Sequence, residues 1–314
     1  MSTPPAGTTK KRMLSRHDYL APLPIPTGRK PSDVLNTIWR KNEVFLDVGS
    51  YSIGSAVMTM WPSLMVVLAM SFFTRNLDSD FSQGILILGA VILGVPTLIL
   101  IQGLFREVPL PVRFNRQRRE VCVPRDDGEY WIVPWETVTA AATQQSSVSQ
   151  AGKATMGLLI IGFENPDPQA KEENKHFSLG FNCGGGTTAM ALWECMRSYM
   201  EIGAEAVPES RVGVAPYEET QIGSIITDLR KGNLLGVLWG IFCITILGTY
   251  LAEKLQDLKL SHPPDLSYPD IIEWSKPLPP EQSAKRSPEL EEAIAKRNAE
   301  LAAQAEPMLL MEQS

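Results

Sequence analysis

The chain has 314 residues, of which 44% are hydrophobic and 20% charged, and its formal net charge at neutral pH is −6. An acidic chain whose basic arm lacks aromatic residues interleaved with the basic ones is not typical of a nucleic-acid-binding protein. The four cysteines form no CxxC pair and the three histidines lie in separate segments, so zinc-ligand spacing is absent. We therefore expect no nucleic-acid partner, no metal and no cofactor.

Residues 1–43 form a basic leader with eight basic and three acidic side chains. Its beginning, STPPAGTTKKR, is rich in proline and poor in aromatic residues, a composition typical of disorder. Positive charge next to anionic headgroups is attractive. The sequence thus predicts a disordered N-terminus that lies close to membrane lipids.

Residues 44–105 contain two long apolar runs, at about 54–73 and 84–105. Each run has about twenty residues, which is the length a helix needs to cross roughly 30 Å of hydrocarbon. A buried helix of a soluble protein is the alternative, but such a helix usually carries a polar stripe at helical period, and neither run does. About ten residues separate the runs, so we expect a transmembrane helical hairpin.

A third uncharged run fills residues 232–252 and predicts a third transmembrane helix. Basic residues gather in 1–43 and just after the second run, which favours a cytoplasmic N-terminus and a cytoplasmic middle segment. Three crossings would then place residues 253–314 on the opposite, periplasmic face. This tail is acidic and rich in proline, and Ser287 and Pro288 predict the start of a helix over about 288–305.

The middle segment, residues 106–231, is expected to fold as a cytoplasmic α+β domain. Strand-like stretches occupy 112–123, 130–138, 156–163 and 176–181, whereas the polar, serine-rich stretch 144–153 reads as a loop. An amphipathic helix over 187–206 follows, with an apolar face that includes Met190, Trp193 and Met200. Strands closed by one helix are the plan of a pleckstrin-homology-like barrel or of an open α+β sheet.

The candidate binding site is a cluster of arginines close to the end of the second apolar run, made of Arg113, Arg116, Arg118 and Arg119. One interpretation is contact with anionic lipid headgroups, and the other is a plain topology signal. Gly184, Gly185 and Gly186 precede a helix but lack the Lys-Ser/Thr of a P-loop, so a flexible connection is the better interpretation. No nucleophile–base pair is apparent, and we assign no catalytic residue.

One resemblance rests on R-F-N-R-Q-R-R-E-V (Arg113 to Val121) and V-P-W-E-T-V (Val133 to Val138), which follow the hairpin. A second rests on the hairpin, on P-V-R-F-N-R-Q-R-R-E-V (Pro111 to Val121) and on P-W-E (Pro134 to Glu136). The middle segment resembles bacterial membrane-anchored pleckstrin-homology-like domains. The chain is also similar to a domain-of-unknown-function family of uncharacterised proteobacterial inner-membrane proteins, often encoded beside type VI secretion effectors. This second resemblance implies a bacterial inner (plasma) membrane location and an immunity or accessory role.

The sequence therefore predicts a three-span α-helical membrane protein with a cytoplasmic α+β domain. We expect it to be non-enzymatic and to bind a protein partner, which by resemblance would be a secreted effector. The alternative is a membrane-anchored module that senses a lipid or another ligand. Neither the partner nor the oligomeric state is indicated.

Overall fold

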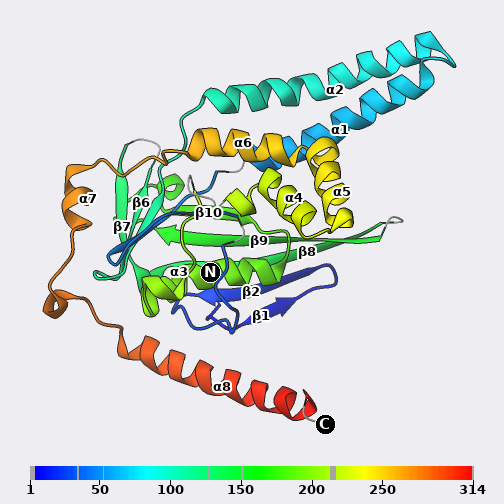
Figure 1. Ribbon diagram of the computed structural model, residues 1–314. Coiled ribbons are helices and arrows are strands. Elements are labelled where there is room, and N and C mark those ends of the chain that lie inside the picture. Colours follow the sequence, from blue (N-terminus) through cyan, green and yellow to red (C-terminus); the bar gives the residue numbers. More distant parts are fainter. Residues whose placement is uncertain are drawn as a thin grey trace. The chain divides into compact units, whose positions relative to one another are not determined.

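The computed structural model describes residues 4–33, 35–51, 53–125, 128–149, 152–212 and 217–312. The chain divides into two compact units, each built from segments that are distant in the sequence. Unit 1 contains Met1–Ser50, Leu110–Ser210 and Asp265–Ser314, and unit 2 contains Tyr51–Pro109 and Arg211–Pro264. Figure 1 shows the strands of unit 1 and the helices of unit 2.

Unit 1 is built on two antiparallel sheets, each of five strands within the described residues. Sheet A has the order β1-β2-β8-β9-β10, with the bounds β1 Thr9–Lys11, β2 Ser15–Ala21, β8 Thr139–Ser149, β9 Gly152–Glu164 and β10 His176–Asn182. Sheet B has the order β3-β4-β5-β6-β7, with the bounds β3 Ile38–Lys41, β4 Phe45–Val48, β5 Val112–Asn115, β6 Glu120–Pro124 and β7 Tyr130–Pro134.

The two sheets and helix α3 (Gly186–Glu201) share one hydrophobic core. Strands of both sheets, but not the exposed β1, contribute residues to this core, and successive side chains of a strand face opposite sides of the sheet. Phe114 and Leu159 are fully buried, and so is Trp193 of α3, whose ring stacks on Trp135 with centroids 5.4 Å apart. The α+β class predicted for this domain is therefore confirmed.

Short 3-10 turns occupy Trp135–Thr137, Glu172–Asn174, Ala204–Ala206, Tyr217–Glu219 and Pro280–Gln282.

Unit 2 contains the helical hairpin, α1 (Ile53–Thr74) and α2 (Ser79–Phe105). Both predicted helices are confirmed, and both are long and apolar enough to cross a membrane. They pack closely near the connecting turn, where the hydroxyl oxygens of Ser71 and Ser82 are 2.8 Å apart. Gly89 lies against Val67, and a Cβ at position 89 would come within 2.4 Å of that side chain. Small residues of this kind let membrane helices approach each other.

The third apolar run is not one straight helix. It comprises α5 (Leu234–Phe242), a π-helical turn (Cys243–Leu247) and the start of α6 (Thr249–Leu260), and the two parts meet at a bend of 69°. Helix α4 (Gln221–Arg230) precedes it. The three continuous spans expected from hydropathy are thus reduced, among the described residues, to two long apolar helices and one broken segment.

The N-terminus differs from its expected disorder. The described part of residues 1–43 supplies β1, β2 and β3, which pair in both sheets. Leu20, Ala21 and Ile38 enter the core. The reason is long-range: β2 pairs with β8, more than a hundred residues later, and no local composition reveals such a partner. The predicted loop 144–153 is likewise mostly strand, because β8 and β9 pair with each other as far as Ser149 and Gly152.

The tail differs most. Residues 265–314, with α7 (Pro269–Trp274) and α8 (Pro288–Glu312), belong to the same compact unit as residues 110–210. Two segments of one compact unit lie on the same side of any membrane. The structure thus packs the tail with the middle domain, whereas the sequence led us to expect the two on opposite faces of a membrane.

Candidate functional site

The tail covers the outer face of sheet B through polar and apolar contacts. Phe114, Val121 and Val133 point into the core, so the residues between them in the strands point outward. We call this surface the tail-binding face and define it by Asp47, Arg113, Asn115, Glu120, Cys122, Tyr130 and Ile132. Residues 265–275 lie on it.

Arg113 is the centre of the polar half of the tail-binding face. Its Nε and Nη2 donate to the two carboxylate oxygens of Asp47 at 2.6 and 2.8 Å. Nη2 also donates to Asp265 Oδ1 at 2.6 Å, and Nη1 donates to Ser275 Oγ at 2.9 Å. Asp47 and Arg113 are both buried. A buried ion is costly unless it is fully paired, so the tail completes a site that the strands alone leave partly unsatisfied.

The contact with Arg113 lowers the pKa of Asp265. Desolvation acts to raise the pKa of Asp265, but the hydrogen bond and the charge of Arg113, together with Arg40, bring it below its ordinary value. Asp265 therefore remains ionised when the tail is bound. Its side chain is 57% exposed, so solvent screens part of the attraction.

The other half of the tail-binding face is apolar. Leu266, Ile271 and Trp274 of the tail form a buried cluster with Cys122. The rings of Tyr130 and Tyr268 pack with their centroids 5.0 Å apart. The indole nitrogen of Trp274 donates to Glu120 at 2.8 Å. The backbone carbonyl oxygen of Trp274 accepts from Asn115 and from Arg118, each at 3.0 Å.

A second set of polar contacts holds the tail at the C-terminal end of α3, where it is centred on Glu201. The buried carboxylate of Glu201 accepts hydrogen bonds from Arg119 Nη2 at 2.8 Å, from Trp135 Nε1 at 2.7 Å and from Arg286 Nε of the tail at 2.6 Å. Desolvation acts to raise the pKa of Glu201, but the hydrogen bond and charge of Arg119, with Trp135 and Arg286, lower it below its ordinary value. The ionised carboxylate thus joins core, sheet and tail.

The four arginines of the sequence-predicted site do not form one exposed cluster. Arg113 is buried beside Asp47, and Arg119 is buried beside Glu201. Arg118 donates to the Trp274 carbonyl, and Arg116 Nη2 donates to the Ile202 carbonyl at 2.9 Å. Contact with lipid headgroups therefore does not hold for Arg113 and Arg119. A signal was present in the sequence, because Arg113 lies between two apolar residues of a strand and thus on its opposite face.

Three cysteines are buried and unreactive thiols. Burial raises the pKa of Cys122 and of Cys195 to about 12 and that of Cys183 to about 11. Thiolate is the reactive form, so these side chains react slowly at neutral pH. In the described part of the chain, no group of three or more histidine, cysteine or carboxylate side chains is placed to hold a metal ion.

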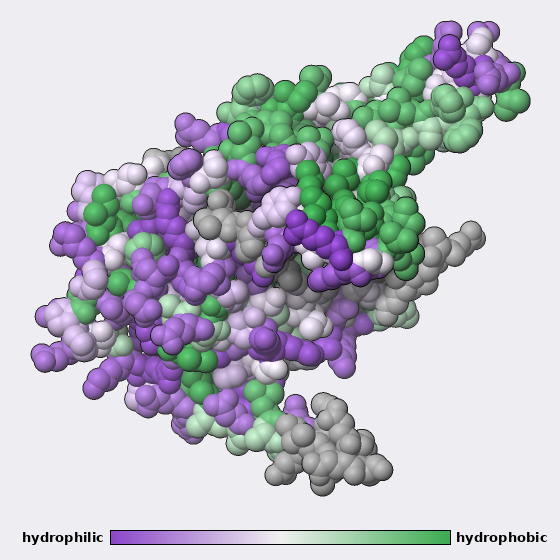
Figure 2. All heavy atoms as spheres, in the orientation of Figure 1, coloured by the Kyte–Doolittle hydropathy of each residue, from purple (hydrophilic) through white to green (hydrophobic). Residues whose placement is uncertain are grey.

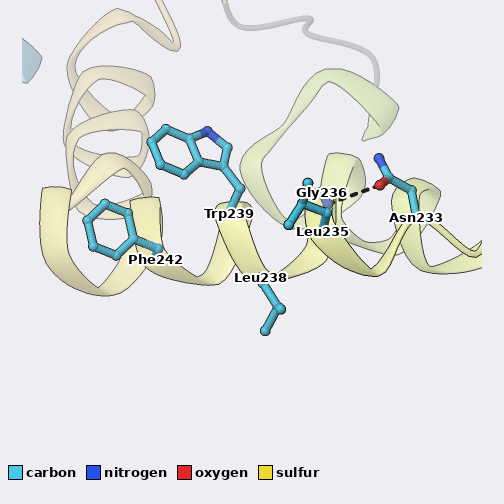
Figure 3. Close-up of a pocket in the computed structure, with 6 residues that line it drawn as sticks. All are labelled: Asn233, Leu235, Gly236, Leu238, Trp239 and Phe242. Atoms are coloured by element: carbon cyan, nitrogen blue, oxygen red, sulfur yellow. Dashed lines mark hydrogen bonds between the residues drawn. The ribbon is translucent and has the colours of Figure 1, made fainter.

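Unit 2 presents its own surface, which is apolar. Figure 2 shows hydrophobic side chains along α1 and α2 and hydrophilic ones at their connecting turn. A shallow hollow of about 650 Å³ lies on α5 and is lined by Asn233, Leu235, Gly236, Leu238, Trp239 and Phe242. In Figure 3 the Asn233 side chain caps the helix by accepting from the Gly236 amide at 3.1 Å. Apolar surfaces of this extent mark membrane or protein contacts.

Comparison of the chain with protein-family models, with curated protein sequences and with solved structures found no match.

Trp274→Ala should release the tail from the tail-binding face. Loss of a buried tryptophan costs about 3–5 kcal/mol. Local opening should therefore expose the Cys122 thiol, with maleimide labelling at pH 8 rising on the order of a hundredfold. Mass spectrometry of the labelled peptide measures this. Ile272→Ala, at an exposed position of the same helix, is the control. Unchanged Cys122 labelling in the Trp274 variant would show that the tail does not protect it.

Glu201→Gln should make stability less dependent on acid pH. Because its pKa is lowered in the folded chain, ionised Glu201 stabilises fully above the unfolded value, about 4.3, and this contribution is lost as pH falls through the lower folded value. The free energy of unfolding should differ between parent and variant at pH 7, and this difference should shrink below about pH 4. Denaturant unfolding in detergent at pH 7 and pH 3 measures it. An equal difference at both pH values contradicts the assignment.

Proposed function

We propose that the protein is a non-enzymatic binding module anchored in the inner membrane of a bacterium by the α1–α2 hairpin, with unit 1 on the cytoplasmic face, where it holds a protein partner. The anchoring is supported by the length and apolarity of α1 and α2. One observation carries the placement of both hairpin ends on one side: β4 and β5, which precede and follow the hairpin, pair directly with each other, Val48 opposite Val112. A hairpin with both ends in one sheet must return to the face from which it departs.

The orientation is supported by charge. The hairpin turn contains one basic residue, Arg75, against Asp78 and Asp80, whereas residues 1–43 carry eight basic side chains. Basic residues accumulate on the cytoplasmic side. Since the tail belongs to unit 1, the proposal places residues 265–314 in the cytoplasm as well.

The free edge of sheet A supports the binding of a protein partner. Strand β10 pairs with β9 along all seven of its residues, and no described strand pairs with its other side. Natural sheets protect such edges with lysines, prolines or bulges, and β10 (HFSLGFN) has none of these. An unprotected edge can add an extended segment of another protein as a further strand. The link to type VI secretion, and the immunity or accessory role, stay predictions from resemblance.

The topology predicts opposite outcomes for two exposed positions. Asn76→Cys in the hairpin turn should be labelled by a membrane-impermeant maleimide in intact cells whose outer membrane admits it. Lys276→Cys in the tail should be labelled only after the inner membrane is permeabilised. The thiols of Cys122, Cys183 and Cys195 are buried, and the partly buried Cys243 is replaced by serine, so the labelling background stays low. Labelling of Lys276→Cys in intact cells would return the tail to the periplasmic face and remove the proposed topology.

Partner binding at β10 predicts position-specific crosslinks. A photoreactive residue in place of Ser178 should crosslink a protein in native membranes, and His176→Lys in the same chain should reduce the product several-fold, because a lysine on an edge strand disfavours strand addition. Gln169, exposed in the loop before β10, is the matched control for both changes. Equal crosslinking from positions 169 and 178, or none from 178, would assign the partner to another surface.

A further inference from the structure

The α5 segment exposes a face that a water-soluble helix would not. From Leu234 to Leu247 it has no charged residue. Leu235, Leu238, Trp239 and Phe242, spaced as one helix face, are 80%, 65%, 64% and 43% exposed. The rings of Trp239 and Phe242 stack with their centroids 5.4 Å apart. Figure 3 shows both side chains on α5. A surface helix in water normally turns its polar face outward, so this face is built for an apolar surrounding.

The opposite face of α5 is occupied by α4. A Cβ at Gly236 would lie 2.5 Å from the Asp228 carboxylate, and one at Gly240 would lie 2.5 Å from the Ile225 side chain. The two glycines, four residues apart, thus let the backbones of α4 and α5 approach closely. Helix α4 shields one side of α5 and leaves the apolar side free within the described part of unit 2.

The break after α5 is fixed by α1. Gly248 adopts φ +69°, and a Cβ there would lie 2.6 Å from the Trp61 ring. The indole nitrogen of Trp61 donates to the Thr245 carbonyl at 2.8 Å, which satisfies a backbone group that the break frees. Because Gly54 of α1 lies against Ala252 of α6, and Trp61 against Gly248, α1 and α6 run antiparallel.

The charged residues of α6 indicate how deep in the bilayer this break lies. Helix α6 carries Glu253, Lys254, Asp257 and Lys259, which do not belong in hydrocarbon. The first turns of α1, beside α6, therefore lie at headgroup level. The axis of residues 234–247 makes an angle of 69° with the axis of α6. If α6 lies along α1, this angle directs α5 toward the plane of the bilayer. Fourteen residues at 1.5 Å each span roughly 21 Å, short of the roughly 30 Å of hydrocarbon.

We propose that residues 234–247 lie in the membrane interface as an in-plane helix, with lipid acyl chains filling the hollow at Leu235, Leu238, Trp239 and Phe242. Arg230 and Lys231, just before α5, then face the headgroups. Trp239 takes the interfacial position that tryptophan favours. The inference rests on the proposed membrane anchoring and deepens it by naming a second lipid-binding element. It also explains how the chain returns to unit 1 on the same face without a third crossing.

Spin-label depth measurements test this on the full chain in vesicles of phosphatidylcholine and phosphatidylglycerol. Nitroxides are attached one at a time to cysteines at Leu235, Leu238 and Phe242, in a Cys243→Ser background. The label at Ile92, midway along α2, reports the bilayer centre, and the label at Lys231 reports the headgroup side. The depth of each label follows from the ratio of its collision rate with oxygen to its collision rate with a water-soluble nickel chelate.

We expect similar, shallow depths for the three α5 labels, about 5–10 Å below the headgroups as for interfacial helices, and a much greater depth at Ile92. Depths that increase steadily from 235 to 242 toward the far leaflet indicate a third crossing and overturn the inference. If the α5 labels are as accessible to nickel as the label at Lys231, α5 faces water. If they are protected from both reagents, protein covers α5. Either result overturns the inference. A shallow label at Ile92 would instead refute the anchoring by α1 and α2.

Discussion

The pairing of β4 with β5 is the constraint on which the remaining architecture depends. Four residue pairs join them, from Phe45 with Asn115 to Val48 with Val112, although more than sixty residues separate Val48 from Val112. Every residue of the helical hairpin lies inside that connection. Closing so long a loop costs conformational entropy, which grows slowly with loop length, and the self-contained packing of α1 on α2 lowers that cost further. The helical hairpin is thus an insertion that the sheet tolerates because its two ends leave from neighbouring strands.

Sheet B needs the tail for an electrostatic reason. Arg113 is fixed by its bidentate contact with Asp47, but its remaining donors reach Asp265 and Ser275 of the tail. A buried guanidinium with free donors would be costly, and neighbouring Cys122 would face water on an apolar patch. At the other end, Glu201 accepts from Arg119 of the sheet and Arg286 of the tail. Tail and strands therefore fold as one unit, although hydropathy separates them with an apolar run.

Elements whose signal is local were predictable. The hairpin helices, expected at 54–73 and 84–105, run from Ile53 to Thr74 and from Ser79 to Phe105, since twenty uncharged residues suit a helix. The amphipathic helix expected at 187–206 is α3, Gly186–Glu201, and its Trp193 is fully buried. The start of the tail helix was also predictable, because Ser287 and Pro288 are a typical helix start and α8 begins at Pro288. The N-terminal strands and the packing of the tail were not predictable, because core residues such as Leu20, Ile271 and Leu290 find their partners far along the chain. The arginine site failed for the same reason: its acidic partners Asp265 and Glu201 come from distant segments.

The third apolar run shows what hydropathy leaves undetermined. An uncharged stretch long enough to cross a bilayer is equally compatible with one straight helix and with a shorter one that bends at a glycine. Only the path of the chain separates them. Residues 110–210 and 265–314 share one compact unit, so under the proposed anchoring the segment between them crosses the membrane an even number of times. One bent segment whose second half carries Glu253, Lys254 and Asp257 cannot supply two crossings. The proposal therefore has this segment make no crossing, and the left-handed Gly248, packed against Trp61, is the residue at which the chain turns back on the same side.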